Sequence, residues 1–283
     1  MMELKLPFGF KEGKLVEISQ VERGLACGCN CPCCGTPLIA RKGGKTIHHF
    51  AHDKSAECKG AYETMLHIAA KEILEKHKKI RLPAVISSIG IGWDVHSLYE
   101  IHRERYIHFD KVYLEKKLDD IVPDIILEVE GRKLLVEIAV THFIDEVKLK
   151  KIQKLNISTL EIDLSYLKGG PPITIQEIER ALLNGLDCKK WKYNIKTEAF
   201  RKNVLQNATE LKVNSHVFES RVQDCPKRKG TNGESYAIIT NDCFNCKYFL
   251  DYTSSEFVQF ETIKCGGAFK EQIDKFTSRY RKF

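Results

Sequence analysis

The sequence contains no run of the ~20 apolar residues that a membrane-spanning helix needs. Its first residues, MMELKLPFGFKEGK, lack the apolar segment of a secretory signal. There is neither an internal repeat nor a low-complexity segment. These absences argue against membrane, secreted and repeat proteins, and they predict a cytoplasmic protein with an ordinary folded core.

The composition predicts a folded chain with an excess of basic residues. The 283 residues suffice for one large domain or two ordinary ones, and 43% of them are hydrophobic. Lys and Arg number 45 against 38 Asp and Glu, which gives a formal net charge of +7. This charge is compatible with nucleic acid as a partner but does not identify one. A homo-oligomer and a protein partner both stay open.

The 11 cysteines form two clusters that flank a cysteine-free middle, with only Cys188 apart. In a chain without a signal segment, such clusters favour metal ligation or redox chemistry over disulfides. The first cluster contains a Cys-x2-Cys knuckle, a turn that brings two thiolates to one tetrahedral ion. The next nitrogen or sulfur ligands come from HHFAH, residues 48–52, and from Cys58. We expect a closed structural zinc site, with His49 as the alternate ligand, made by Cys31, Cys34, His52 and Cys58.

Two other interpretations of the first cluster stay open. Cys27, Cys29 and Cys33 offer different ligand registers, and the cluster could be a redox site. A closed four-ligand zinc site leaves no position for a reacting water, so we do not expect its histidines to be catalytic.

The second cluster has a central knuckle with one further cysteine on each side. This spacing predicts a second structural zinc ion. An iron-sulfur cluster needs the same four thiolates and is the runner-up. The ligands in both cases are Cys225, Cys243, Cys246 and Cys265.

Residues 122–142, VPDIILEVEGRKLLVEIAVTH, predict a β-hairpin that carries two carboxylates. Two apolar alternating strands are joined by a turn at residues 130–132. Asp124 opens the first strand, and Glu137 lies inside the second. Burying an isolated carboxylate is costly unless it is paired or binds a metal, so we expect Asp124 to lie close to Glu137.

A helix with a polar row is expected before the hairpin, over about residues 61–79. Its apolar residues recur at helical spacing. Glu63, His67 and Lys71 follow one another at i, i+4 positions, so their side chains share one face. A solvated helix face is the simpler interpretation of this row.

The remaining pattern predicts an α/β (α+β) organisation in four segments. A helix is expected over about residues 143–155 and a strand over 157–164, before a Gly-Gly-Pro-Pro break at 169–172. Thr174 and Glu177 predict a capping box that begins another helix, and residues 190–222 are expected to be helical and basic. The segments are a zinc-binding module at 1–58, a core at 59–168, a helical extension at 169–222 and a four-cysteine module at 223–283.

Several motifs together resemble one known family. They are CPCCG at residues 31–35, HHFAH, Cys58, the Glu63 to Lys71 row, the Pro-Asp pair at 123–124 and the Glu-Ile-Ala run at 137–139. In this order they resemble the competence protein CoiA-like family over about residues 25–165. That resemblance implies a core similar to PD-(D/E)XK nucleases, with a mixed central sheet flanked by helices and a zinc-ribbon-like N-terminal module.

The resemblance also implies roles for the acids. Asp124 matches the motif aspartate, Glu137 the second acid, and Glu63 the acid on the first core helix. Together they would bind Mg²⁺ or Mn²⁺, which prefer hard oxygen ligands. Such an ion polarises a phosphate and lowers the pKa of the attacking water.

The sequence departs from the family pattern at Ala139, where a lysine is expected two residues after the glutamate. Another cation would have to replace it, and Lys71, Lys148 and Lys151 are the candidates. Thr141 and His142 are expected close to the metal. His67 and His142 are candidates for proton transfer.

These features predict a metal-dependent nuclease acting on DNA, or else RNA, with the zinc modules assisting nucleic-acid binding. Phosphate contacts are expected from a lysine-rich helix face, although such faces are usually just solvated. Its members are Lys148, Lys150, Lys151 and Lys154. One alternative is a catalytically inactive, nuclease-like adaptor that binds nucleic acid. The other is a structural protein whose zinc modules contact protein partners.

Overall fold

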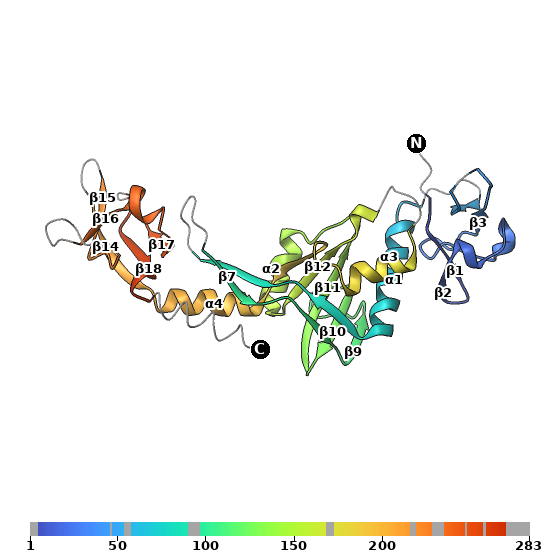
Figure 1. Cartoon of the computed structure of the whole chain (residues 1–283), viewed down its shortest axis with the longest axis horizontal. Helices are drawn as coiled ribbons and strands as arrows, with labels where there is room; N and C mark the ends of the chain where they lie inside the picture. The colour runs from blue at the N-terminus through green and yellow to red at the C-terminus, as the bar shows by residue number, and fades with distance from the viewer. Residues whose placement is uncertain are drawn as a thin grey trace. The chain divides into compact units, whose positions relative to one another are not determined.

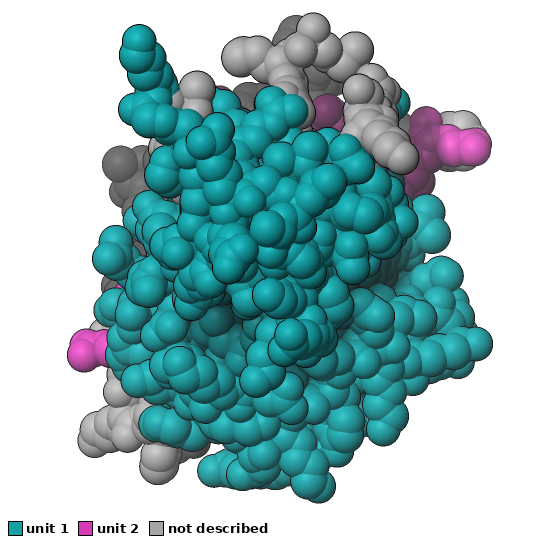
Figure 2. Space-filling view, turned by 90° about the vertical axis from the view of Figure 1, so that its right-hand side faces the viewer, with its two compact units in different colours: residues 1–83, 105–193 teal, residues 84–104, 194–283 magenta. Residues whose placement is uncertain are grey.

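The computed structural model describes most of the chain and divides it into two compact units (Figure 2). Unit 1 comprises residues 1–83 and 105–193, and unit 2 comprises residues 84–104 and 194–283. The described residues are 5–45, 47–53, 58–89, 97–167, 173–215, 219–227, 235–246, 248–256 and 259–269. The predicted break at 169–172 lies outside them.

Unit 1 begins with two short antiparallel strand pairs. They are β1 (Phe8–Lys11) with β2 (Lys14–Glu17), and β3 (Leu38–Arg41) with β4 (His49–His52). Phe8 and Phe50 are fully buried and belong to the same apolar cluster as the first long helix. The N-terminal segment therefore shares its core with the rest of unit 1, because its own apolar residues are few.

A five-stranded mixed sheet forms the centre of unit 1, in the order β13-β12-β11-β10-β9. Its central pair, β11 and β12, is parallel, and every other pairing is antiparallel. The strands are β9 (Lys111–Leu114), β10 (Ile125–Val129), β11 (Arg132–Ala139), β12 (Thr159–Asp163) and β13 (Lys189–Tyr193). A second, two-stranded sheet pairs β5 (Lys79–Leu82) with β8 (Arg105–His108).

The predicted hairpin is confirmed as β10 and β11, with Ile125 opposite Val136. Its turn residues Glu130 and Gly131 have φ values of 48° and 76°. Positive φ at both central residues matches the right-handed twist of a tight hairpin, and glycine adopts it at little cost.

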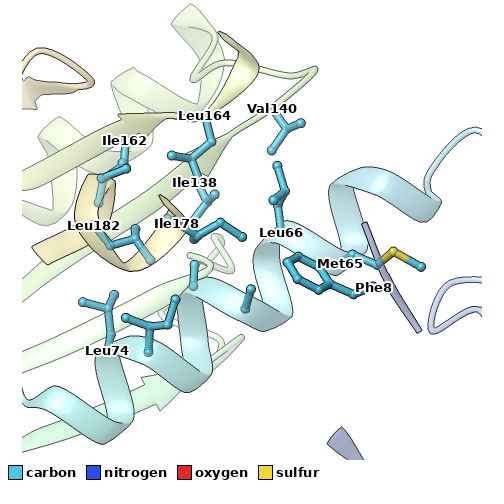
Figure 3. Close-up of a cluster of buried hydrophobic side chains, with 14 of the residues drawn as sticks. Phe8, Met65, Leu66, Leu74, Ile138, Val140, Ile162, Leu164, Ile178 and Leu182 are labelled. Atoms are coloured by element: carbon cyan, nitrogen blue, oxygen red, sulfur yellow. The ribbon is translucent and has the colours of Figure 1, made fainter. Parts of the chain in front are cut away.

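Helices cover both faces of this sheet (Figure 1). On one face α1 (Ala61–His77) and α3 (Ile175–Leu183) pack against Ile138 and Ile162, as Figure 3 shows. On the other face α2 (Glu146–Leu155) packs Ile152 against Ile126 and Leu135. Side chains two residues apart in a strand point to the same face, so Glu137 lies on the α2 side of the sheet together with Leu135.

Helix boundaries follow local capping chemistry. Thr174 and Glu177 form the predicted capping box at α3. The helix predicted to begin at residue 143 begins at Glu146 instead, because the Asp145 carboxylate accepts a hydrogen bond from the backbone N–H of Lys148. In the described residues, no helix is long and apolar enough to cross a membrane.

Unit 2 contains one helix, a strand pair and an antiparallel five-stranded sheet among its described residues. The helix α4 (Ile195–Gln206) packs against β6 (Val85–Ile89) and β7 (Ser97–His102), and the Tyr99 and Phe200 ring centroids are 5.5 Å apart. The sheet order is β16-β15-β14-β18-β17. Its strands are β14 (Thr209–Ser215), β15 (Ser220–Gln223), β16 (Tyr236–Ile238), β17 (Phe249–Thr253) and β18 (Thr262–Cys265).

The prediction that residues 190–222 are helical is wrong outside α4. Strands β13, β14 and β15 occupy most of the remainder. In β14, Leu211 and Val213 alternate with polar residues and pack toward one buried cluster, which is the two-residue period of a strand. The predicted segment boundaries at 58, 168 and 222 stay predictions, and the two compact units divide the chain at other positions.

Candidate functional sites

The structure brings the preferred zinc ligands together. The ligand atoms of Cys31, Cys34, His52 and Cys58 all lie within 4.8 Å of one another. No other group of three or more Cys, His, Asp or Glu ligands in the described part of the chain is this close. The knuckle is closed by a 2.8 Å hydrogen bond from the Gly35 N–H to the Cys31 carbonyl. This cluster could hold a metal such as zinc.

The alternate ligands are not part of this group of four. His49 is 7% exposed, and its Nδ1 donates a 2.8 Å hydrogen bond to the carbonyl of Ile47. It precedes His52 by three strand positions, so the two imidazoles leave opposite faces of β4. Cys27 and Cys29 are buried in the apolar core, and Cys33 is exposed. Among the described residues, the four ligand atoms that meet are those of the preferred set.

Burial makes two of the thiols in this cluster harder to ionise. Burial raises the pKa of Cys58 to about 12 and also raises that of Cys31. A hydrogen bond with the Thr36 hydroxyl lowers the pKa of Cys34 to about 6. Metals bind the thiolate form, so a bound ion would supply the charge that buried thiolates need.

Glu137 is the buried carboxylate of the second candidate site. The residue is 5% exposed, and Lys148 Nζ donates a 2.7 Å hydrogen bond to Glu137 Oε2. Within the described residues, Oε1 of Glu137 is buried without a hydrogen-bond partner. Burial and the nearby Asp124 raise the pKa of Glu137 to about 7, against the opposing effect of Lys148.

Asp124 and His67 connect α1 to the hairpin. Asp124 Oδ2 accepts a 2.8 Å hydrogen bond from the N–H of Ile138. His67 Nδ1 lies 3.6 Å from Asp124 Oδ1, and His67 Nε2 donates to the Ile138 carbonyl at 2.8 Å. The residue after Glu137 thus fixes both the aspartate and the histidine through its backbone.

Glu63, Thr141 and His142 form a third group at the end of β11. The Thr141 hydroxyl donates to Glu63 Oε2 and lies 2.9 Å from His142 Nδ1. His142 Nδ1 is 3.5 Å from Glu63 Oε1, and the imidazole is 87% exposed. Burial alone would raise the pKa of Glu63, but the hydrogen bonds from Thr141 and His142 outweigh it and lower that pKa.

The three candidate replacement cations have different partners. Lys71 forms an ion pair with Glu115, and Lys151 Nζ lies 3.3 Å from Asp120 Oδ2. Lys148 alone of the three bonds to Glu137. On the same helix, Lys150 and Lys154 are exposed. No sequence pattern pointed to Glu115, which follows β9 in a left-handed conformation and donates its N–H to the Asp124 carbonyl.

The second cysteine set is assembled more loosely than the first. Its four cysteines line one cavity of about 300 Å³ in unit 2. Although all four are described, their sulfurs do not meet within 4.8 Å as the N-terminal ligands do.

A comparison with family models identifies the N-terminal part of the chain. Residues 17–61 match the model described as "Competence protein CoiA, N-terminal domain". This segment is similar to a CoiA N-terminal domain. The CoiA-like domain contains all four ligands of the Cys/His cluster and ends where α1 begins. Searches of curated proteins and of solved structures returned no match, and the acidic site lies beyond the matched residues.

Proposed function

We propose that this chain is a metal-dependent nuclease that hydrolyses phosphodiester bonds of nucleic acid, with DNA preferred over RNA. The ion pair between Lys148 and Glu137, beside Asp124, carries the proposal. A cation from α2 occupies the neighbourhood of the acid strand, where the family pattern has a lysine and this chain has Ala139. The central sheet would then be a PD-(D/E)XK-type core.

Asp124 and Glu137 fit a hard divalent ion such as Mg²⁺ or Mn²⁺. Glu137 Oε1 is buried without a partner among the described residues, and a buried carboxylate oxygen in that state is costly. Mg²⁺ needs only one or two protein carboxylates, because it keeps several waters. When bound, the ion would polarise the phosphate and lower the pKa of its water.

The other residues would orient groups and move protons. Lys148 Nζ supplies positive charge where negative charge develops during phosphodiester hydrolysis. The Ile138 N–H donates to the Asp124 carboxylate, and His67 Nδ1 lies 3.6 Å from its other oxygen. Thr141 engages Nδ1 of His142, which leaves the exposed imidazole free to exchange a proton with solvent through Nε2.

Nucleic acid is proposed as the substrate on the basis of charge and family name. The exposed Lys150 and Lys154 extend from the helix that carries Lys148. The net charge of +7 favours a polyanion. The printed description of the matched domain connects it with competence, and we infer a competence-related role for this chain.

The test is cleavage of labelled single- and double-stranded DNA and RNA by the zinc-loaded full chain with Mg²⁺ or Mn²⁺. Asp124→Asn and Glu137→Gln should abolish cutting. Asp120→Asn, which changes a half-exposed carboxylate paired with Lys151, should not. Cutting by the first two variants at the wild-type rate would overturn the assignment.

A catalytically inactive adaptor is the second candidate. It is favoured by Ala139 and by the partner that Glu137 already has in Lys148, since a carboxylate paired with a lysine does not require a metal ion for charge neutralisation. Nucleic-acid binding that survives both acid substitutions, with no cutting under any metal, would favour this function over the nuclease.

A further inference from the structure

Three separate segments of unit 2 bring four cysteines to one cavity. Cys225 follows β15, Cys243 and Cys246 lie at the end of the π-helical turn Ile239–Cys243 and just beyond it, and Cys265 ends β18. All four line the cavity of about 300 Å³, and none forms a disulfide. Antiparallel pairing of the intervening strands therefore gathers residues that are up to forty positions apart in sequence.

A close contact between Gly267 and the Pro226 side chain lies beside the outer two cysteines. A Cβ added at Gly267 would lie 2.8 Å from Pro226 Cγ and 3.2 Å from Cys265 Sγ. Only glycine allows the segment after Cys265 to pass this close to the proline that follows Cys225. The N–H of Gly267 also donates a 3.3 Å hydrogen bond to Cys265 Sγ, as backbone groups do to metal-bound sulfur.

The inner two cysteines form a knuckle of their own. The Cys246 N–H donates to the Cys243 carbonyl at 2.8 Å, and the Phe249 N–H donates to the Cys246 carbonyl at 3.0 Å. Both cysteines of this knuckle line the cavity. Cys243 and Cys265 are each 7% exposed.

The surroundings of the cavity are largely apolar. Leu211, Val222 and Ile263 contribute to its lining, together with the ring of Phe249. Burial and the other three cysteines together raise the pKa of Cys243 to about 12. Four thiols around one cavity in a small apolar core are an arrangement that a multivalent cation stabilises.

The spacing of the sulfurs differs from that of the N-terminal cluster. A zinc ion with Zn–S bonds of about 2.3 Å holds its four sulfurs roughly 3.8 Å apart, and the N-terminal ligands meet within 4.8 Å. The unit 2 sulfurs surround a cavity without meeting this closely. A centre of several metal ions separates its cysteine ligands further than a single ion does.

We propose that Cys225, Cys243, Cys246 and Cys265 bind an iron-sulfur cluster in unit 2. The cluster is held by four thiolates in an apolar pocket, with the Gly267 N–H and the Lys227 side chain on its rim. The sequence-based expectation of a second zinc ion is replaced by this assignment. It does not depend on the nuclease proposal.

The test is metal and sulfide analysis of the full chain after anaerobic reconstitution with Fe²⁺ and sulfide. Iron and acid-labile sulfide should appear in near-equal amounts with a brown visible absorption, and both should disappear in Cys225→Ser and Cys243→Ser. Cys188→Ser should keep them, and Cys34→Ser should lose zinc while keeping iron.

Three outcomes would overturn the proposal. The first is uptake of zinc and no iron at both cysteine clusters of the wild type, a result that requires no variant to fold. The second is iron at the wild-type level in both unit 2 variants. The third is loss of iron in Cys34→Ser alone, which would move the cluster to the N-terminal domain.

Discussion

Unit 1 contains two candidate metal sites with opposite character. The N-terminal site is closed, because three thiols and one imidazole already lie within 4.8 Å of one another. The acidic site is open, because one carboxylate oxygen of Glu137 accepts a hydrogen bond from Lys148 and the other has no partner among the described residues. A closed site of soft ligands stabilises a fold, whereas an open site of hard ligands can accept an ion together with a substrate.

The largest effect is expected from a substitution that removes a ligand of the closed site. Cys58→Ala should lose the zinc ion and unfold the CoiA-like domain, since structural zinc contributes about 10–16 kcal/mol of apparent binding free energy in small domains. Metal content and limited proteolysis measure this. Cys33→Ser, which changes an exposed cysteine outside the ligand set, is the control and should keep its zinc. Full zinc content in Cys58→Ala would contradict the predicted ligand set.

The next largest effect is expected from a substitution that removes the lysine of the open site. Lys148→Met should lower the single-turnover cleavage rate by about 10²–10³, the range for losing one group that stabilises developing charge. Lys148→Arg should restore part of the rate. Lys151→Met is the matched control on α2, because Lys151 pairs with Asp120 rather than Glu137. Equal rates for the Lys148 and Lys151 variants would show that Lys148 is not the replacement lysine.

Lys189 is a buried lysine of unit 1 that lies in neither the closed nor the open site. Burial lowers its pKa to about 8, and its Nζ donates to the Arg81 carbonyl at 2.9 Å. Because the unfolded chain keeps its proton up to about pH 10.5, the wild type should gain stability relative to Lys189→Met as pH rises from 8 to 10.5. The gain should be on the order of 3 kcal/mol, measured by denaturant unfolding of both proteins. A pH-independent difference would contradict the lowered pKa.

The smallest expected effect concerns Thr141. Removing its hydroxyl in Thr141→Val deletes the hydrogen bond to Glu63 and should cost about 1 kcal/mol of unfolding free energy. The double variant with Glu63→Gln measures the coupling between the two residues. Additive effects of the two single changes would show that the contact contributes nothing.

Local spacing was enough to predict several features. The Cys-x2-Cys knuckle with His52 and Cys58 identified the closed cluster, because its ligands come from consecutive short elements. Period-two alternation placed Glu137 inside a buried strand, and the capping box located the start of α3. Each of these features depends on residues near one another in sequence.

Features that depend on tertiary packing could not be predicted in the same way. The sequence could not distinguish which of three lysines would replace the missing one. In the structure, the packing of α2 against the sheet pairs Lys148 with Glu137, whereas Lys71 pairs with Glu115. The spacing that separates the unit 2 sulfurs likewise depends on how β14, β15 and β18 pair. Ion pairs between distant segments leave no periodic signal along the chain.

Mn²⁺ binding to the zinc-loaded full chain, followed by electron paramagnetic resonance, tests the open site most directly. We predict one Mn²⁺ per chain that Mg²⁺ displaces, with affinity lowered by about 10-fold or more in Asp124→Asn and in Glu137→Gln and unchanged in Asp120→Asn. No bound Mn²⁺ in the wild type, or equal binding in all four proteins, would contradict a catalytic ion between Asp124 and Glu137.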